Sequence, residues 1–105
     1  MSLPPLTPEE RAAALEKAAR ARKERAEVKD RLKHGTTTLP DVLRYAAGDE
    51  VLAGTKVVAL IRSVPGVGPV KARQIMERLG IADTRRVKGL GPNQRAALME
   101  EFAVT

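Results

Sequence analysis

Residues 64–80 read VPGVGPVKARQIMERLG, and this stretch sets the expected fold of the whole chain. Its first six positions hold two prolines and two glycines, a composition that favours a tight turn over any regular element. Pro69 suits the first position of a helix, and Gly80 suits the residue that ends one. The stretch therefore predicts a glycine hairpin that leads directly into an amphipathic helix. The apolar residues on one face of that helix are Ala72, Ile75, Met76 and Leu79.

The segments that flank the hairpin are also predicted to be helical. Upstream, a short helix is expected from Pro40 to about Ala47, and Thr55 is expected to cap a further helix that Pro65 stops. Downstream, a short basic turn precedes a last helix that starts near Pro92. No segment alternates as a strand would, so we expect an all-α fold with five main helices and one short helical turn. The residues expected at the centre of the core are Val57, Val58, Leu60, Ile61 and Val64.

The N-terminal third of the chain is predicted to form one long helix. Thr7 and Glu10 occupy the two positions of a capping box, with Pro8 at the first helical position between them. No glycine or proline follows until Gly35, so the helix is expected to run for about 26 residues and roughly 40 Å.

This long helix offers little apolar surface to a core. Val28 and Leu32 are its better anchors, and both lie near its C-terminal end. We therefore expect its N-terminal half to project from the body. The expected organisation is a long helix with its cap over residues 1–35, followed by a helix-two-turns-helix domain over residues 36–105.

The predicted hairpin is a candidate phosphate-binding site. Gly66 and Gly68 let the backbone take a tight path and approach a ligand closely, while Val67 can point into the core. The free N–H groups at the start of the next helix and the helix dipole attract an anion. The pattern looks like a helix-hairpin-helix element, which binds the DNA backbone without reading sequence, and a bare turn between helices is the alternative. The candidate residues are Pro65, Gly66, Val67, Gly68, Val70, Lys71 and Arg73.

The charge of the chain favours a polyanionic partner. Lys and Arg outnumber Asp and Glu by 19 to 13, which gives a net charge of +6, and by seven to two over residues 65–99. Such a balance is typical of proteins that bind nucleic acid or an anionic membrane. The alanine-rich long helix lacks the bulky apolar anchors of a membrane-surface helix, and no apolar run approaches the ~20 residues of a membrane span. We therefore expect a nucleic acid as partner and no membrane.

Catalysis, metal binding and cofactor binding are not expected. The chain has no cysteine, and its single histidine, His34, borders a glycine that ends a helix, where interaction with the helix dipole accounts for it. Asp49 and Glu50 belong to a helix start rather than to a metal-ligand cluster. Residues 1–5 lack the basic and apolar regions of a secretory signal, so a cytoplasmic protein is expected. We expect no enzyme activity, no cofactor, no metal and no small-molecule substrate.

A longer set of residues resembles a known module, the helix-two-turns-helix of a small-subunit ribosomal protein and of formamidopyrimidine-DNA glycosylases. Three further segments narrow the match: LPPLTPEERAAALEKAA (3–19), DRLKHG (30–35) and IMERLGIADTRRVKGLG (75–91). Over residues 3–103 the chain is similar to the actinobacterial integration host factor family. The residues that carry the module resemblance are Gly66, Val67, Gly68, Ala72, Ile75, Leu79, Gly80, Ile81, Val87, Leu90, Gln94 and Leu98.

The resemblance implies a nucleoid-associated protein that binds duplex DNA with little sequence preference, bends or bridges it, and assists phage site-specific integration. Phage integrase–DNA complexes are then expected partners. The arginine-rich DNA contact of the family falls on residues 84–89, which makes Arg85, Arg86 and Lys88 the candidate side chains. Lys88 is a conservative departure at a position where arginine also occurs, and a solvated turn is the alternative for this segment.

A second DNA contact and a second class of partner stay open. Acid-before-base pairs such as Glu16–Arg20 support an exposed helix that stabilises itself, whereas the alanines between its cations would let it approach a duplex closely. Structured RNA is the alternative partner because the ribosomal protein shares the hairpin, although only Tyr45 and Phe102 could stack on unpaired bases. The residues of the second candidate contact are Arg20, Arg22, Lys23, Arg25, Lys29 and Lys56.

Overall fold

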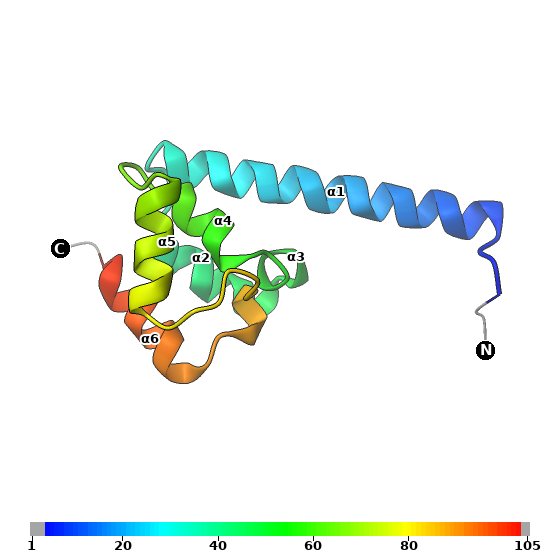
Figure 1. Cartoon of the computed structure of the whole chain (residues 1–105). Helices are drawn as coiled ribbons and strands as arrows, with labels where there is room; N and C mark the ends of the chain where they lie inside the picture. The colour runs from blue at the N-terminus through cyan, green and yellow to red at the C-terminus, as the bar shows by residue number, and fades with distance from the viewer. Residues whose placement is uncertain (1–3, 104–105) are drawn as a thin grey trace.

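The computed structural model describes residues 4–103, which form an all-helical body with one long arm (Figure 1). No strand occurs in these residues, as the sequence predicts. Residues 1–3 and 104–105 lie outside the described part. The expectation that residues 1–5 hold no secretory signal therefore falls mostly on residues that the structure does not describe. No helix in residues 4–103 is both long and apolar enough to cross a membrane. The elements are α1 (Pro8–Lys33), α2 (Leu39–Tyr45), a 3-10 turn (Ala46–Gly48), α3 (Glu50–Ala53), α4 (Val57–Arg62), α5 (Pro69–Arg78), a second 3-10 turn (Val87–Gly89) and α6 (Pro92–Glu101).

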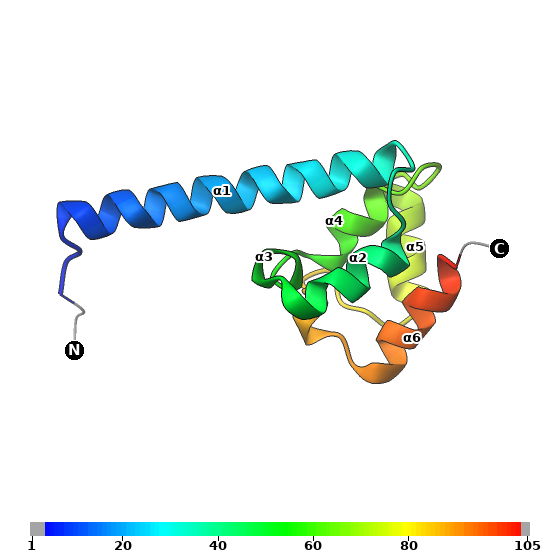
Figure 2. The same ribbon diagram turned by 180° about the vertical axis from the view of Figure 1, so that it is seen from behind.

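The α1 helix forms the arm, and its sequence accounts for its start and its exposure. The Thr7 hydroxyl accepts the N–H of Glu10 at 3.1 Å, and the Glu10 carboxylate accepts the N–H of Thr7 at 3.3 Å. This completes the predicted capping box. Only Val28 and Leu32 of α1 are buried. Figures 1 and 2 show its N-terminal half extending past the rest of the molecule, which confirms the predicted projection and both anchors.

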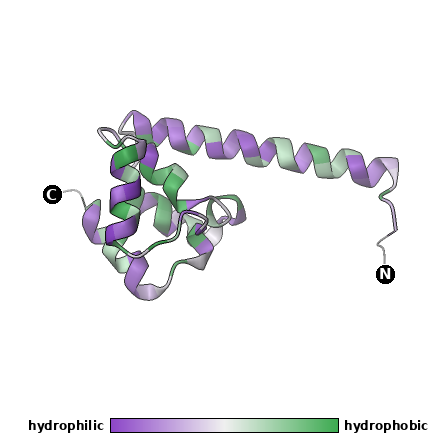
Figure 3. Ribbon diagram, in the orientation of Figure 1, coloured by the Kyte–Doolittle hydropathy of each residue, from purple (hydrophilic) through white to green (hydrophobic). Residues whose placement is uncertain are grey.

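The core gathers around α4 and α5. Val57, Leu60 and Ile61 are buried as predicted, whereas Val58 and Val64 are only partly buried at the edge of the core. Figure 3 shows the ribbon of α4 as mostly hydrophobic, in contrast to α1, along which hydrophilic and hydrophobic residues alternate. Each fully buried aliphatic side chain of this size stabilises the fold by about 1.5–3 kcal/mol. The α5 residues that complete this part of the core are Ala72, Ile75 and Met76.

One predicted helix cap is wrong. Thr55 does not cap α4, because it is buried and its hydroxyl donates to the Val51 carbonyl at 2.7 Å in the preceding turn. Lys56 holds the cap position without a side-chain hydrogen bond. The N–H of Val57 donates instead to the Arg85 carbonyl at 3.0 Å. A hydrogen bond between distant parts of the chain thus satisfies one of the free N–H groups at the start of α4, as the side chain of a capping residue would otherwise do.

Polar contacts fix the two turns between α5 and α6. The Gln94 side chain donates to the Gly80 carbonyl at 2.8 Å and accepts the N–H of Gly91 at 3.1 Å. A bidentate ion pair between Arg78 and Glu101 joins the C-terminal ends of α5 and α6. The Arg78 guanidinium holds the pKa of the Glu101 carboxyl below its usual value. The turns therefore have a defined path before any ligand binds.

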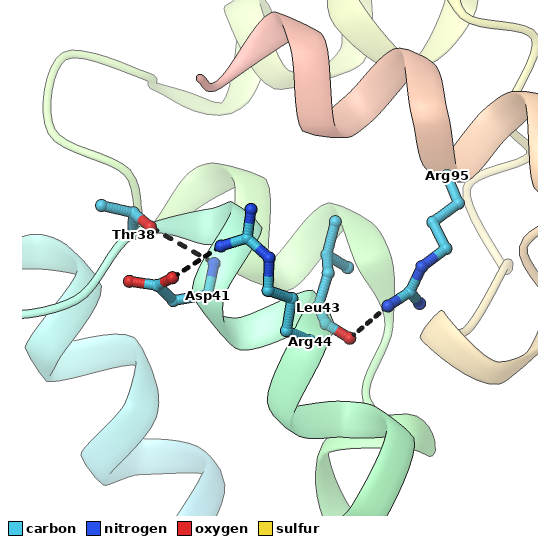
Figure 4. A network of polar contacts seen from close by, with 5 residues as sticks. All are labelled: Thr38, Asp41, Leu43, Arg44 and Arg95. Carbon is cyan, nitrogen blue, oxygen red and sulfur yellow. Dashed lines mark hydrogen bonds and ion pairs between the residues drawn. The ribbon is translucent and has the colours of Figure 1, made fainter. Parts of the chain in front are cut away.

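A second polar network ties α6 to α2 (Figure 4). The Arg95 guanidinium donates to the Leu43 carbonyl at 2.7 Å. At the start of α2, the Thr38 hydroxyl accepts the N–H of Asp41 at 3.3 Å, and the Asp41 carboxylate accepts from Arg44 at 2.8 Å. Thr38 is therefore the N-cap residue of α2. Because α2 is only seven residues long, such contacts are needed to hold it in place.

Candidate nucleic-acid interface

The hairpin joins α4 to α5 and is fastened to the core. Val67 is partly buried against the core, as predicted, and its N–H donates to the Val64 carbonyl at 3.0 Å. Gly66 adopts φ +82°, a left-handed conformation that favours glycine. Gly68 is extended, with φ −89° and ψ −177°, and a Cβ there would meet no atom within 4 Å. The fold therefore favours glycine at position 66 but accepts a side chain at position 68.

The start of α5 presents unused hydrogen-bond donors. Gly68 occupies the cap position without a side-chain partner, and the first helical hydrogen bond runs from the N–H of Ala72 to the Gly68 carbonyl at 2.9 Å. Within residues 4–103, no acceptor receives the N–H of Gly68, Val70 or Lys71. Pro69 lies among them and has no N–H to offer. The result is a set of open amides at the positive end of a ten-residue helix, which can bind an oxyanion.

The side chains around these amides are exposed and two of them are cationic. Lys71 and Arg73 are both exposed on the first turns of α5. The Val70 side chain is 72% exposed. Pro65 and Gly66 are exposed as well. The structure thus brings all seven candidate residues of this segment to one end of α5.

The second cationic element is the turn that carries Arg85, Arg86 and Lys88. It is pinned to the start of α4, because the N–H of Val87 donates to the Thr55 carbonyl at 3.0 Å and Lys56 pairs with Arg86 as an isolated antiparallel bridge. All four cations of this basic turn, Lys56, Arg85, Arg86 and Lys88, are exposed. Lys56 therefore joins the arginine-rich segment rather than the long helix.

The two arginines of the basic turn also have structural roles that the sequence did not predict. The Arg85 guanidinium donates to the Gly89 carbonyl at 2.8 Å, which closes the turn on itself. The Arg86 guanidinium donates to the carbonyl of Gly54, which lies two residues before Lys56, the residue that Arg86 pairs with. Within residues 4–103, Lys88 donates to no other group. Of the three, Lys88 is therefore the simplest reporter of an external ligand.

The predicted cations of α1 do not behave as one group. Lys29 lies beside the hairpin, where it lines a groove together with Lys33 and Arg62, two residues that the sequence did not single out. Arg20, Arg22 and Lys23 are exposed along the arm, and Arg20 pairs with Glu16 at 3.6 Å, as the helix spacing predicts. Arg25 is partly buried.

The hairpin and the basic turn lie at opposite ends of α4. The basic turn bonds to residues at its start, and the hairpin follows its last turn. Six helical residues rise about 9 Å, so the two cationic elements are separate but close. One nucleic-acid duplex can therefore reach both, or two duplexes can approach from different sides.

The chain is similar to a known domain family, to integration host factors and to a solved structure. Residues 32–102 match the model of the S13-like H2TH domain. The chain is 61% identical to the integration host factor of Streptomyces coelicolor, over 100% of this chain and 98% of the relative, and 61% identical to that of Mycobacterium tuberculosis, over 97% of each. It is also similar to the solved structure of sIHF bound to an 8-base-pair palindromic DNA, with a TM-score of 0.81 and 57% identity over 84% of this chain and 99% of that one.

Proposed function

The chain belongs to the actinobacterial integration host factor family, and we propose that it is a nucleoid-associated protein that binds the phosphate backbone of duplex DNA with little sequence preference. The open amides of Gly68, Val70 and Lys71 are the observation that carries this proposal. They form a set of free donors at the positive end of α5 that can bind a phosphate, and a backbone contact carries no base code. The proposed contacts are Pro65, Gly66, Val67, Gly68, Val70, Lys71, Arg73, Arg85, Arg86 and Lys88.

The two cationic elements suggest how the protein shapes DNA. Contacts at both ends of α4 would either draw one duplex around the small body, which bends it, or hold two duplexes, which bridges them. Such architectural work would assist phage integrase–DNA complexes without a catalytic step, so we propose no enzyme activity. We place the DNA-binding domain in residues 36–105 and the protein in the cytoplasm, on the nucleoid.

Fluorescence anisotropy over a salt series tests this function. We expect one short duplex DNA and its scrambled version to bind with similar affinity, and the logarithm of the binding constant to fall linearly with the logarithm of salt concentration. The slope is about 0.9 per neutralised phosphate. A matched RNA duplex should bind more weakly. Preference for the RNA duplex would favour a ribosomal-type function, and absence of binding to either would leave the hairpin as a turn.

Replacing Gly68 by alanine is expected to weaken DNA binding without destabilising the fold. The extended backbone at position 68 accepts any residue and the added Cβ meets open space, so we expect a thermal midpoint within about 2 °C of the wild type. A phosphate bound to the adjacent amides would meet that Cβ, so DNA affinity should fall several-fold.

Gly66→Ala, at another proposed contact, gives the contrasting effect on stability, because it forces an alanine into a left-handed conformation and should cost about 1 kcal/mol. Unchanged DNA affinity in Gly68→Ala would show that no phosphate approaches this backbone closely.

A further inference from the structure

The last turns of α1, the end of α4 and the hairpin enclose an open groove of about 540 Å³. Figures 1 and 2 both show the hairpin beside the C-terminal end of α1. Lys29 and Lys33 line the groove from α1, Arg62 lines it from α4, and residues 65–67 close it. Among residues 4–103, no carboxylate lines this cationic groove.

The three cations of the groove are not neutralised by the protein. Within residues 4–103 the ion pairs involve other basic groups, and none includes Lys29, Lys33 or Arg62. Lys33 and Arg62 each lie in the last turn of a helix, where a cation compensates the helix dipole. That effect accounts for each of them alone. It does not account for Lys29, which lies a turn earlier and is partly buried in the same groove.

The opposite side of α1 has the opposite charge. A second hollow of about 480 Å³ there is lined by Glu24, Glu27 and Asp49, and Arg31 is the one cation among its described lining residues. Burial and the neighbouring Asp49 carboxylate raise the pKa of Glu24. Asp49 also caps α3, because its carboxylate accepts the N–H of Val51 at 2.9 Å. A polyanion is therefore repelled on this face of α1 and attracted on the groove face.

We propose that the cationic groove binds the phosphodiester backbone of the DNA that the hairpin engages, with Lys29, Lys33 and Arg62 as direct phosphate contacts. The inference rests on the proposed function and extends it. The hairpin then stands between two phosphate sites, the open amides of α5 on one side and the groove on the other. The backbone of the bound strand crosses the hairpin from one site to the other, and the C-terminal part of α1 forms a wall of the DNA site.

The test compares two triple variants of the full chain that lose the same charge. The groove variant carries Lys29→Gln, Lys33→Gln and Arg62→Gln, which keep long, helix-compatible side chains. The control carries Arg11→Gln, Lys17→Gln and Arg31→Gln, all exposed positions of α1 outside the groove. Binding of a 20-base-pair duplex is measured by anisotropy over a salt series, and folding of each variant by its thermal midpoint.

The groove variant is expected to bind at least about tenfold more weakly at 0.1 M salt, with a salt slope smaller by about 2 to 3, since each lost phosphate contact removes about 0.9. The control should lose less than about threefold through general electrostatic attraction and keep its slope. Equal behaviour of the two folded variants would overturn the groove inference while the wild-type slope still supports the proposed function. A wild type that fails to bind DNA would overturn both. If the glutamine variant is unfolded, Lys29→Arg, Lys33→Arg and Arg62→Lys must restore both folding and the full slope, or the inference fails.

Discussion

Replacing Leu60 by alanine is expected to destabilise the fold by about 2–5 kcal/mol, a large fraction of the ~5–15 kcal/mol that typically stabilises a folded domain. Leu60 is 1% exposed and lies on α4 between the basic turn and the hairpin. The cost combines the lost burial of the side chain with the cavity left behind. The core has little to compensate it, because Tyr45 is exposed and Phe102 is only partly buried. Urea unfolding followed by far-ultraviolet circular dichroism measures the loss.

The same chemical change on the arm provides the control. Leu15 is 65% exposed on α1, so Leu15→Ala should change the free energy of unfolding by no more than about 0.5 kcal/mol. We expect Leu60→Ala also to lose DNA affinity, because α4 positions both cationic elements. A Leu60→Ala variant as stable as Leu15→Ala would mean that α4 is not at the centre of the core.

Most of the fold could be predicted because its signals are local. The capping residues Thr7 and Thr38 bond to groups three positions away, and the hairpin and the helix after it are encoded in one continuous stretch. The cap at Thr55 could not be predicted in the same way. The N–H of Val57 at the start of α4 donates to the Arg85 carbonyl, 28 residues further on, and only the tertiary fold brings the two together.

The same distinction applies to the candidate site. The hairpin and the arginine-rich turn are contiguous in sequence, so residue type and spacing could indicate both. The cationic groove joins Lys29 and Lys33 to Arg62, which lie on helices separated by α2 and α3. Nor could composition reveal that Arg85 and Arg86 bond to the protein itself. The sequence shows which residues are basic, but it does not show which of them already donate hydrogen bonds to the protein.

The double variant Arg85→Ala, Arg86→Ala is expected to weaken DNA binding by about 10- to 100-fold, and to do so equally for unrelated duplexes. A loss of this size corresponds to about 1.4–2.8 kcal/mol, or roughly 1 kcal/mol for each exposed charge contact, and phosphates carry no base code. Anisotropy with two unrelated duplexes over a salt series measures the affinity, and the slope should fall by about 2. A loss confined to one sequence would indicate base contacts instead.

The structure adds a complication to this double variant and a way around it. Both guanidiniums donate to backbone carbonyls, so their removal should also destabilise the turn by roughly 1 kcal/mol per lost hydrogen bond. Weaker binding could then reflect a displaced turn rather than lost phosphate contacts.

The double variant Lys56→Ala, Lys88→Ala avoids this ambiguity, because neither side chain bonds to another group within residues 4–103. This pair should leave the thermal midpoint unchanged and still lower the salt slope by about 2. If only the arginine variant loses affinity, and it loses stability in parallel, then the arginines hold the turn in shape and the DNA contact lies elsewhere.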